Sequence, residues 1–266
     1  MKKIKNLKAV DAVKKGKTLT AKYLLSAKIF KKYSGITRSM KYLYELSERH
    51  NWRRNTLLHI ATYLEQNDTV KTILEIADIY LHNHTTAICN FRNKFKETPL
   101  HLSRSLEVVK LLVASGADVN SRTTTMATPL HYCRNNVDLA KFLILHGAIV
   151  NVKDDNGRTP LHQAESKEMA ELLIEMGADL NAIDCVGMTP LYTKNVDIAR
   201  ALLKHGADVE QGNFKLVNHD SIQGPLEHAF YHRHSGMIRL LLENGADIHK
   251  VDKALLRGWN YHYGFR

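Results

Sequence analysis

Several features are scarce in this chain of 266 residues. Apolar runs stop after a few positions, as at residues 142–145, far below the roughly 18–20 residues that a helix needs to span a bilayer. The three cysteines, Cys89, Cys133 and Cys185, are an odd number at wide spacing, which fits a reducing compartment better than a disulfide framework. No low-complexity stretch argues for a long disordered region. We expect a folded, cytoplasmic protein.

Acidic side chains are scarce in residues 1–54. That segment holds 16 Lys+Arg against three Asp+Glu, a charge of +13, whereas residues 55–266 hold 22 Lys+Arg and 24 Asp+Glu, a charge of −2. A nucleic-acid-binding body more often carries its charge on the folded face. Residues 1–17 are therefore interpreted as a basic tail, which is solvated, or lies on an anionic membrane, or binds nucleic acid, or serves as an address.

Motifs of catalysis are missing as well. The chain has no Cys-x-x-Cys or His-Glu-x-x-His, no phosphate-binding loop and no Gly-x-Ser-x-Gly. His228, His232 and His234 cluster near the C-terminus, and the first two are spaced to share one side of a helix, as metal ligands sometimes do. Without an accompanying motif we expect no metal site, no cofactor and no enzymatic activity.

A short motif recurs at a nearly constant interval. Thr-Pro-Leu-His occupies residues 98–101, 128–131 and 159–162, and Thr-Pro-Leu-Tyr occupies residues 189–192. Repeats with a period of about 30 residues indicate an array of supersecondary units that bury their apolar faces only by stacking. The period therefore predicts a stacked architecture.

A second motif keeps the same interval. Gly-Ala-Asp or a close variant begins at Gly116, Gly147, Gly177, Gly206 and Gly245. Together the two motifs resemble the ankyrin repeat over about residues 55–250. The resemblance implies an all-α solenoid of stacked helix pairs with β-hairpin-like fingers, about six repeats long and monomeric.

The remaining segments are assigned around that repeat domain. Residues 1–17 are the basic tail, and residues 18–54 contain two amphipathic patterns that we interpret as a helical N-terminal cap. Residues 251–266 carry aromatic side chains that we expect to form a C-terminal cap, because a terminal repeat exposes one apolar face.

Each motif residue has a physical role. Threonine before proline begins a helix, and proline fits its first turn because no backbone donor is needed there. The leucine after it is expected in the core, and glycine supplies the left-handed residue that ends the second helix. The resemblance implies that the histidine at the fourth position (His59, His101, His131 and His162) bonds to neighbouring loops.

The repeats differ in length. The motif leucine and the closing residue of the second helix lie farther apart in the two end repeats, Leu58 to Ala77 and Leu226 to Gly245, than in the four middle repeats. The inner helix should therefore be about one turn shorter in the middle repeats. The connections at residues 78–97 and 207–223 are longer than the others, which predicts two extended fingers.

The resemblance also implies a concave recognition surface formed by finger tips and the exposed side of the inner helices. The predicted partner-binding residues on the fingers are Thr124, Thr125, Ala127, Asp155, Asn156, Arg158, Cys185, Val186 and Met188. Near the ends of the shortened inner helices they are Arg104, Arg134, Glu165 and Lys194. Phe214, in the second long finger, is predicted to fold back over the stack or to anchor a partner, because exposed aromatic rings are favoured contact points.

The sequence thus predicts a protein–protein interaction module with a protein partner. The trimmed repeats and the Lys/Asn/Ile-rich usage resemble ankyrin proteins of host-associated bacteria and giant viruses, which suggests an effector that acts on a host protein in the host cytoplasm. The alternative is an adaptor anchored to an anionic membrane or to nucleic acid by the basic tail.

Overall fold

The computed structural model describes residues 55–81, 85–212, 224–253 and 255–257. The predicted basic tail, the predicted N-terminal cap, Phe214 and most of the predicted C-terminal cap lie outside these residues. The domain boundaries assigned from the sequence accordingly stay predictions. The described part divides into two compact units, which are treated separately below: residues up to Cys133 with 145–148, and residues 134–144 with those from Ile149 onwards.

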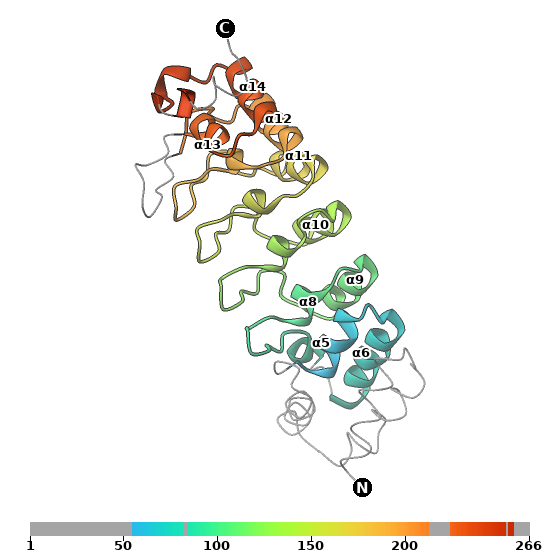
Figure 1. Cartoon of the computed structure of the whole chain (residues 1–266). Helices are drawn as coiled ribbons and strands as arrows, with labels where there is room; N and C mark the ends of the chain where they lie inside the picture. The colour runs from blue at the N-terminus through green and yellow to red at the C-terminus, as the bar shows by residue number, and fades with distance from the viewer. Residues whose placement is uncertain (1–54, 82–84, 213–223, 254, 258–266) are drawn as a thin grey trace. The chain divides into compact units, whose positions relative to one another are not determined.

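Both units are built from a short inner element followed by a longer outer helix (Figure 1). The elements of the first unit are α5 (Leu57–Tyr63), α6 (Asn67–Leu81), α7 (Thr85–Cys89), α8 (Pro99–Leu102), α9 (Leu106–Ala114) and the 3₁₀ turn η1 (Pro129–Tyr132). The second unit has α10 (Val137–Leu145, its last residue belonging to the first unit), η2 (Pro160–Gln163), α11 (Lys167–Glu175), η3 (Pro190–Tyr192), α12 (Val196–Lys204), α13 (Pro225–Tyr231), α14 (Ser235–Glu243) and η4 (Ile248–Lys250). The described residues contain helices and turns and no strand.

The inner elements differ in length as the spacing predicts. The inner helices α5 and α13 each have seven residues, whereas α8, η1, η2 and η3 have only three or four. Two residues after each long inner helix, Glu65 and Arg233 hold left-handed φ values of 53° and 54°. The prediction of trimmed middle repeats is confirmed.

The core consists of the apolar positions predicted from the motifs. The motif leucines are at most 5% exposed. Val108, Val109 and Leu112 of α9 are fully buried, while Leu111 lies half-exposed at its edge. The closing glycines have left-handed φ values between 83° and 91°, as their role requires.

The segment at residues 78–97 is not one extended finger, contrary to the prediction from its length. Its first residues continue α6, and α7 follows before the chain turns at residues 93–97. Asn90 then donates from Nδ2 to the Gly116 carbonyl (2.8 Å) and accepts from the Asp118 amide (2.7 Å). Asn151 makes the same pair of bonds to Gly177 and Asp179. The extra residues thus lie in the end of α6 and in α7, before the finger begins, and the finger turn itself has ordinary length.

Candidate partner-binding surface

Each finger ends in a tight turn that is fixed by one side chain. In the second unit the Asp154 carboxylate accepts from the amides of Asn156 and Arg158, both at 2.9 Å. Asp184 accepts in the same way from Val186 and Met188. Gly157 and Gly187 hold the left-handed residue of the two turns, with φ values of 74° and 90°. The aspartates therefore lie inside the turn, and the residues between them and the glycines form its tip.

Neighbouring fingers within a unit are joined by backbone hydrogen bonds. In the first unit the Thr124 amide donates to the Phe95 carbonyl (2.8 Å), and in the second unit the Cys185 amide donates to the Asn156 carbonyl (2.8 Å). A Cβ atom at Gly157 would lie 2.9 Å from the Cys185 nitrogen. The tips are consequently held at a fixed spacing, so that their side chains form a preorganised surface.

The motif histidines hold the inner elements to the fingers, as the resemblance implies. In His101, Nδ1 accepts from the Thr98 amide (3.1 Å) and contacts the Thr98 hydroxyl (2.9 Å). Its Nε2 then donates to the carbonyls of Ser121 (3.0 Å) and Ala127 (3.3 Å). His59 and His162 bond in the same manner to the carbonyls of Glu97 (3.0 Å) and Met188 (3.2 Å). These imidazoles are structural.

Burial keeps these rings neutral. Desolvation lowers the pKa of His59 to about 4 and that of His101 to about 4, and it also lowers the pKa of His162. A proton on Nδ1 would remove the acceptor that the threonine amide requires. The neutral ring therefore keeps the acceptor on which its structural role depends.

The last two repeats replace this histidine. Tyr192 stands at the position in η3, and the buried hydroxyl of Thr189 has no hydrogen-bond partner among the described residues. Glu227 stands there in α13, where its carboxylate accepts from the Asp252 amide (3.0 Å). The Thr–His arrangement thus ends with His162, and the C-terminal repeats are held differently.

The structure exposes most of the predicted partner-binding residues. Ten side chains are exposed at the tips or the inner loops: Arg104, Thr124, Thr125, Arg134, Asp155, Asn156, Glu165, Cys185, Val186 and Lys194. Two, Arg158 and Met188, are half-buried. Arg158 is drawn back because its guanidinium pairs with the Asp154 carboxylate (3.1 Å). Ala127 is buried, so its prediction as a contact position was wrong; it lies at the base of the turn, where its carbonyl accepts from His101.

The inner loops add charge to this surface. Arg134 and Glu165 form an exposed ion pair at 2.7 Å, and the Glu165 amide donates to the Arg134 carbonyl. Both side chains remain about half-accessible, at 58% and 49%. An ion pair so exposed contributes little stability but is available to a partner.

Several exposed apolar side chains lie on the fingers and inner elements and were not among the predicted partner-binding residues. Met126 lies beside Thr125 in the first unit, and Ile183 lies near Cys185 in the second; each is 42% exposed. On the inner elements Tyr63, Tyr132 and Tyr231 are 44–60% exposed. Position in the repeat could have indicated the two tyrosines of the long inner helices, since those helices have an extra turn with an outward face.

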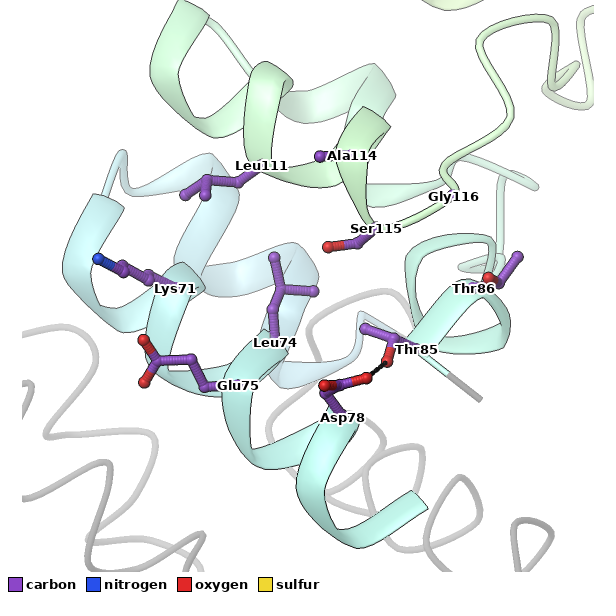
Figure 2. Close-up of a pocket in the computed structure, with 10 residues that line it drawn as sticks. All are labelled: Lys71, Leu74, Glu75, Asp78, Thr85, Thr86, Leu111, Ala114, Ser115 and Gly116. Atoms are coloured by element: carbon purple, nitrogen blue, oxygen red, sulfur yellow. Dashed lines mark hydrogen bonds between the residues drawn. The ribbon is translucent and has the colours of Figure 1, made fainter. Parts of the chain in front are cut away.

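A further concavity lies on the outer side of the first unit, between α6, α7 and α9 (Figure 2). It measures about 590 Å³. Leu74 points from α6 toward α9, and Glu75, Asp78 and Lys71 stand along α6. Asp78 accepts from the Thr85 hydroxyl at 3.4 Å, which joins α6 to α7. No sequence motif indicated this groove, because it depends on α7, an element that the other described repeats lack.

The histidines near the C-terminus do not assemble a metal site in the described part of the chain, where no group of three or more potential ligands converges. His234 uses both ring nitrogens in the structure: Nδ1 accepts from the Met237 amide (3.3 Å) and Nε2 donates to the Lys194 carbonyl (3.0 Å).

Burial raises the pKa of Cys89 and of Cys133 to about 12, so these two thiols stay protonated. In the part of the chain that the structure describes, no helix has the length and apolar character needed to cross a bilayer.

Comparison with known proteins agrees with this geometry. A family profile described as "Ankyrin repeats (3 copies)" matches residues 10–123, 76–154, 104–184 and 131–213. The chain therefore belongs to the ankyrin-repeat family. Among solved structures it is similar to the ankyrin repeat domain of Bcl-3, described as a unique member of the IkappaB protein family, with 26% identity and a TM-score of 0.59. That match covers 73% of this chain and 87% of the other. No curated protein matches the present chain.

Membership defines the class of the molecule. The predictions of an all-α ankyrin solenoid and of a protein–protein interaction module are confirmed at that level. The ankyrin fold is typically a non-enzymatic scaffold whose partners are proteins.

Proposed function

We propose that the chain binds a partner protein through its finger tips and the adjoining inner loops. The observation that carries this proposal is the rigid presentation of dissimilar exposed side chains. In the second unit Asp155, Asn156 and Val186 project from turns that two internal aspartates and an inter-finger hydrogen bond hold in place. A surface organised before binding loses little conformational entropy on association, which favours specific recognition.

A photo-crosslinking experiment tests the contact surface. A benzophenone amino acid replaces Val186 at a tip or, as control, Glu175 on the outer helix α11, in the full chain incubated with eukaryotic cell lysate. A protein that crosslinks at position 186 and not at position 175 is the expected result. Equal crosslinking at both positions, or only at position 175, contradicts the proposal.

Substitutions then test whether the contact supports binding. The triple variant Asp155→Ala, Asn156→Ala, Val186→Ala should lose capture of the crosslinked protein. Its matched control is Lys167→Ala, Glu168→Ala, Glu175→Ala on α11, which removes the same net charge from exposed positions. Circular dichroism melts verify that both variants are folded.

The proposed effector role rests on a resemblance. The trimmed repeats and the Lys/Asn/Ile-rich usage resemble ankyrin proteins of host-associated bacteria and giant viruses, which supports an effector that acts on a host protein. Eukaryotic lysate is accordingly the source of partners in the crosslinking experiment. Recovery of a partner only from lysate of the source organism itself would contradict the effector role and leave the interaction surface intact.

The adaptor alternative has one observation in its favour, the charge of +13 carried by the segment 1–54. Deleting residues 1–17 separates the two functions. If the adaptor function holds, the deletion abolishes sedimentation with phosphatidylserine vesicles or a shift of double-stranded DNA, while capture of the protein partner survives. If vesicle and DNA binding are unchanged, the anchoring role of the tail is wrong.

A further inference from the structure

We propose that the inner face of α13, together with Lys194, binds an acidic segment of the partner protein. This inference rests on the function proposed above and specifies the chemistry of one part of the surface. It concerns residues of the second unit only: Lys194, His228, Tyr231, His232 and Arg233.

The side chains of α13 form one aromatic face. His228 and His232 are four residues apart, so both lie on the same side of the helix, and their ring centroids are 4.4 Å apart. The Tyr231 ring follows at 5.2 Å from that of His232 and is 45% exposed. Exposed tyrosine rings of this kind are common contact points in interfaces, because they bring a large area at low entropic cost.

Lys194 is fixed beside this face by the last repeat. Its carbonyl accepts from Nε2 of His234, and the other nitrogen of that ring accepts from the first turn of α14. This bond ties the loop after η3 to the turn between α13 and α14. Lys194 is exposed, and its charge acts on His228. The loop and the helix thus contribute to one surface.

The charge of the face comes from two exposed side chains, Lys194 and Arg233. Burial lowers the pKa of His228 to about 4, and His232 and Lys194 act on it in the same direction. Arg233 adds a cation at the end of α13. Lys194, His232 and Arg233 belong to none of the ion pairs that join described residues. The neighbouring acid, Glu227, is buried and accepts from the Asp252 amide, while Asp184 lies in the preceding finger turn.

The small number of basic residues on this face favours a peptide over nucleic acid as its ligand. A nucleic-acid surface carries basic residues along an extended face, whereas residues 55–266 hold 22 Lys+Arg and 24 Asp+Glu. Two cations and an exposed tyrosine suit a segment in which carboxylates flank an apolar side chain. We therefore commit to an acidic, partly apolar peptide segment.

Fluorescence anisotropy with defined peptides tests the proposal on the full chain. The probe is a fluorescein-labelled peptide of alternating glutamate and leucine, compared with the same peptide carrying glutamine or lysine in place of glutamate. We expect binding of the glutamate peptide alone, weakened as salt increases because the attraction is partly electrostatic. Equal binding of the glutamine peptide overturns the proposal.

Three substitutions locate the binding. Tyr231→Ala should weaken binding about tenfold and Lys194→Gln about threefold. Arg233→Gly should also weaken it about threefold while keeping the fold, because glycine accepts the left-handed φ of 54° that arginine holds there. The matched control is Lys204→Gln at the end of the outer helix α12, which removes the same charge and should leave the affinity unchanged.

The basic N-terminal segment also attracts acidic peptides, and the variants separate that contribution. The double variant Lys194→Gln, Tyr231→Ala retains the N-terminal segment, so the difference between it and the unaltered chain isolates the α13 face. Binding that none of the α13 substitutions alters, or that Lys204→Gln weakens equally, overturns the proposal. Tighter binding of a single-stranded oligonucleotide that competes at the same residues overturns the choice of a peptide.

Failure here is distinguishable from failure of the proposed function. If crosslinking at position 186 succeeds and the α13 variants bind the glutamate peptide normally, the interaction surface stands and its acidic-peptide site is wrong. If the finger variants retain partner capture but the α13 variants lose the peptide, the fingers are wrong and the α13 site stands.

Discussion

Four repeats keep the motif histidine and two have lost it, and the two groups differ in how their inner elements are held. At His59, His101 and His162 the position is occupied by a ring whose bonds join an inner element to a finger. In the last two repeats it is occupied by Tyr192 and Glu227, which are both buried, and the exposed Tyr231, His232 and Arg233 lie at the end of α13. The surface to which we assign specific chemistry lies in these last two repeats.

The largest effect is expected when acid protonates the buried motif histidines. The pKa of His59 is lowered from 6.5 to about 4, and that of His101 likewise. Between these values the unfolded chain binds more protons than the folded one, so the free energy of unfolding is fully present above pH 6.5 and falls as pH drops toward 4. The contribution of each histidine to the free energy of unfolding should fall by about 3 kcal/mol over this interval. Urea titrations at several pH values measure the slope.

The variant His101→Gln provides the control for that prediction. It should be less stable at neutral pH and show a shallower loss on acidification, because one titrating group is gone. A slope equal to that of the unaltered chain would show that the loss comes from other groups.

Glycine substitutions should reveal the close stacking of fingers in the histidine-bearing repeats. Gly157→Ala and Gly206→Ala both place alanine at a left-handed φ, of 74° and 91°, and share a cost of about 1 kcal/mol. A Cβ at Gly157 also meets the Cys185 backbone at 2.9 Å, whereas a Cβ at Gly206 meets nothing within 4 Å. Gly157→Ala should therefore cost about 2 kcal/mol more. Equal thermal destabilisation of the two variants would contradict the inter-finger contact.

Threonine substitutions test the loss of the Thr–His arrangement directly. Thr159 contacts Nδ1 of His162 at 3.0 Å, so Thr159→Val should lower the free energy of unfolding by about 1–2 kcal/mol. The Thr189 hydroxyl is buried without a partner among the described residues, so Thr189→Val should be neutral or slightly stabilising. Chemical denaturation of both variants measures the difference. A comparable loss at both positions would mean that Thr189 has a partner after all.

The smallest effect is expected at the inner loops. Glu165→Gln breaks the ion pair with Arg134, in which both side chains are about half-exposed, and should change the free energy of unfolding by less than about 0.5 kcal/mol. The same variant should alter partner capture if these loops contact the partner. A loss of stability above about 1 kcal/mol would assign the pair to the scaffold.

Most of the scaffold was predictable from the printed residues. The Thr-Pro-Leu-His interval identified the repeat, and the leucine-to-glycine spacing correctly indicated which inner elements are short. The positions of the contact residues were less predictable. Thr124 and Ala127 precede the same Thr-Pro motif, yet one is exposed and the other buried, because only the folded turn decides which residues lie at its tip.

The first long connection shows the same limit. Counting residues from Ala77 to Thr98 predicts an extended finger, but α6 continues to Leu81 and α7 takes up a further part. The groove between α6, α7 and α9 exists for that reason. A count cannot tell whether an insertion lengthens a helix or a loop, since both consume residues equally.

The sequence by itself determined the family, the relative lengths of the repeats and the positions of the buried leucines and turn glycines. These follow from periodicity, which is a local and repeated property. Only the tertiary structure decided that Arg158 pairs with Asp154 and that His234 is tied to Lys194. Such assignments depend on which side chains meet after stacking, and His234 and Lys194 meet there although they are 40 positions apart in the chain.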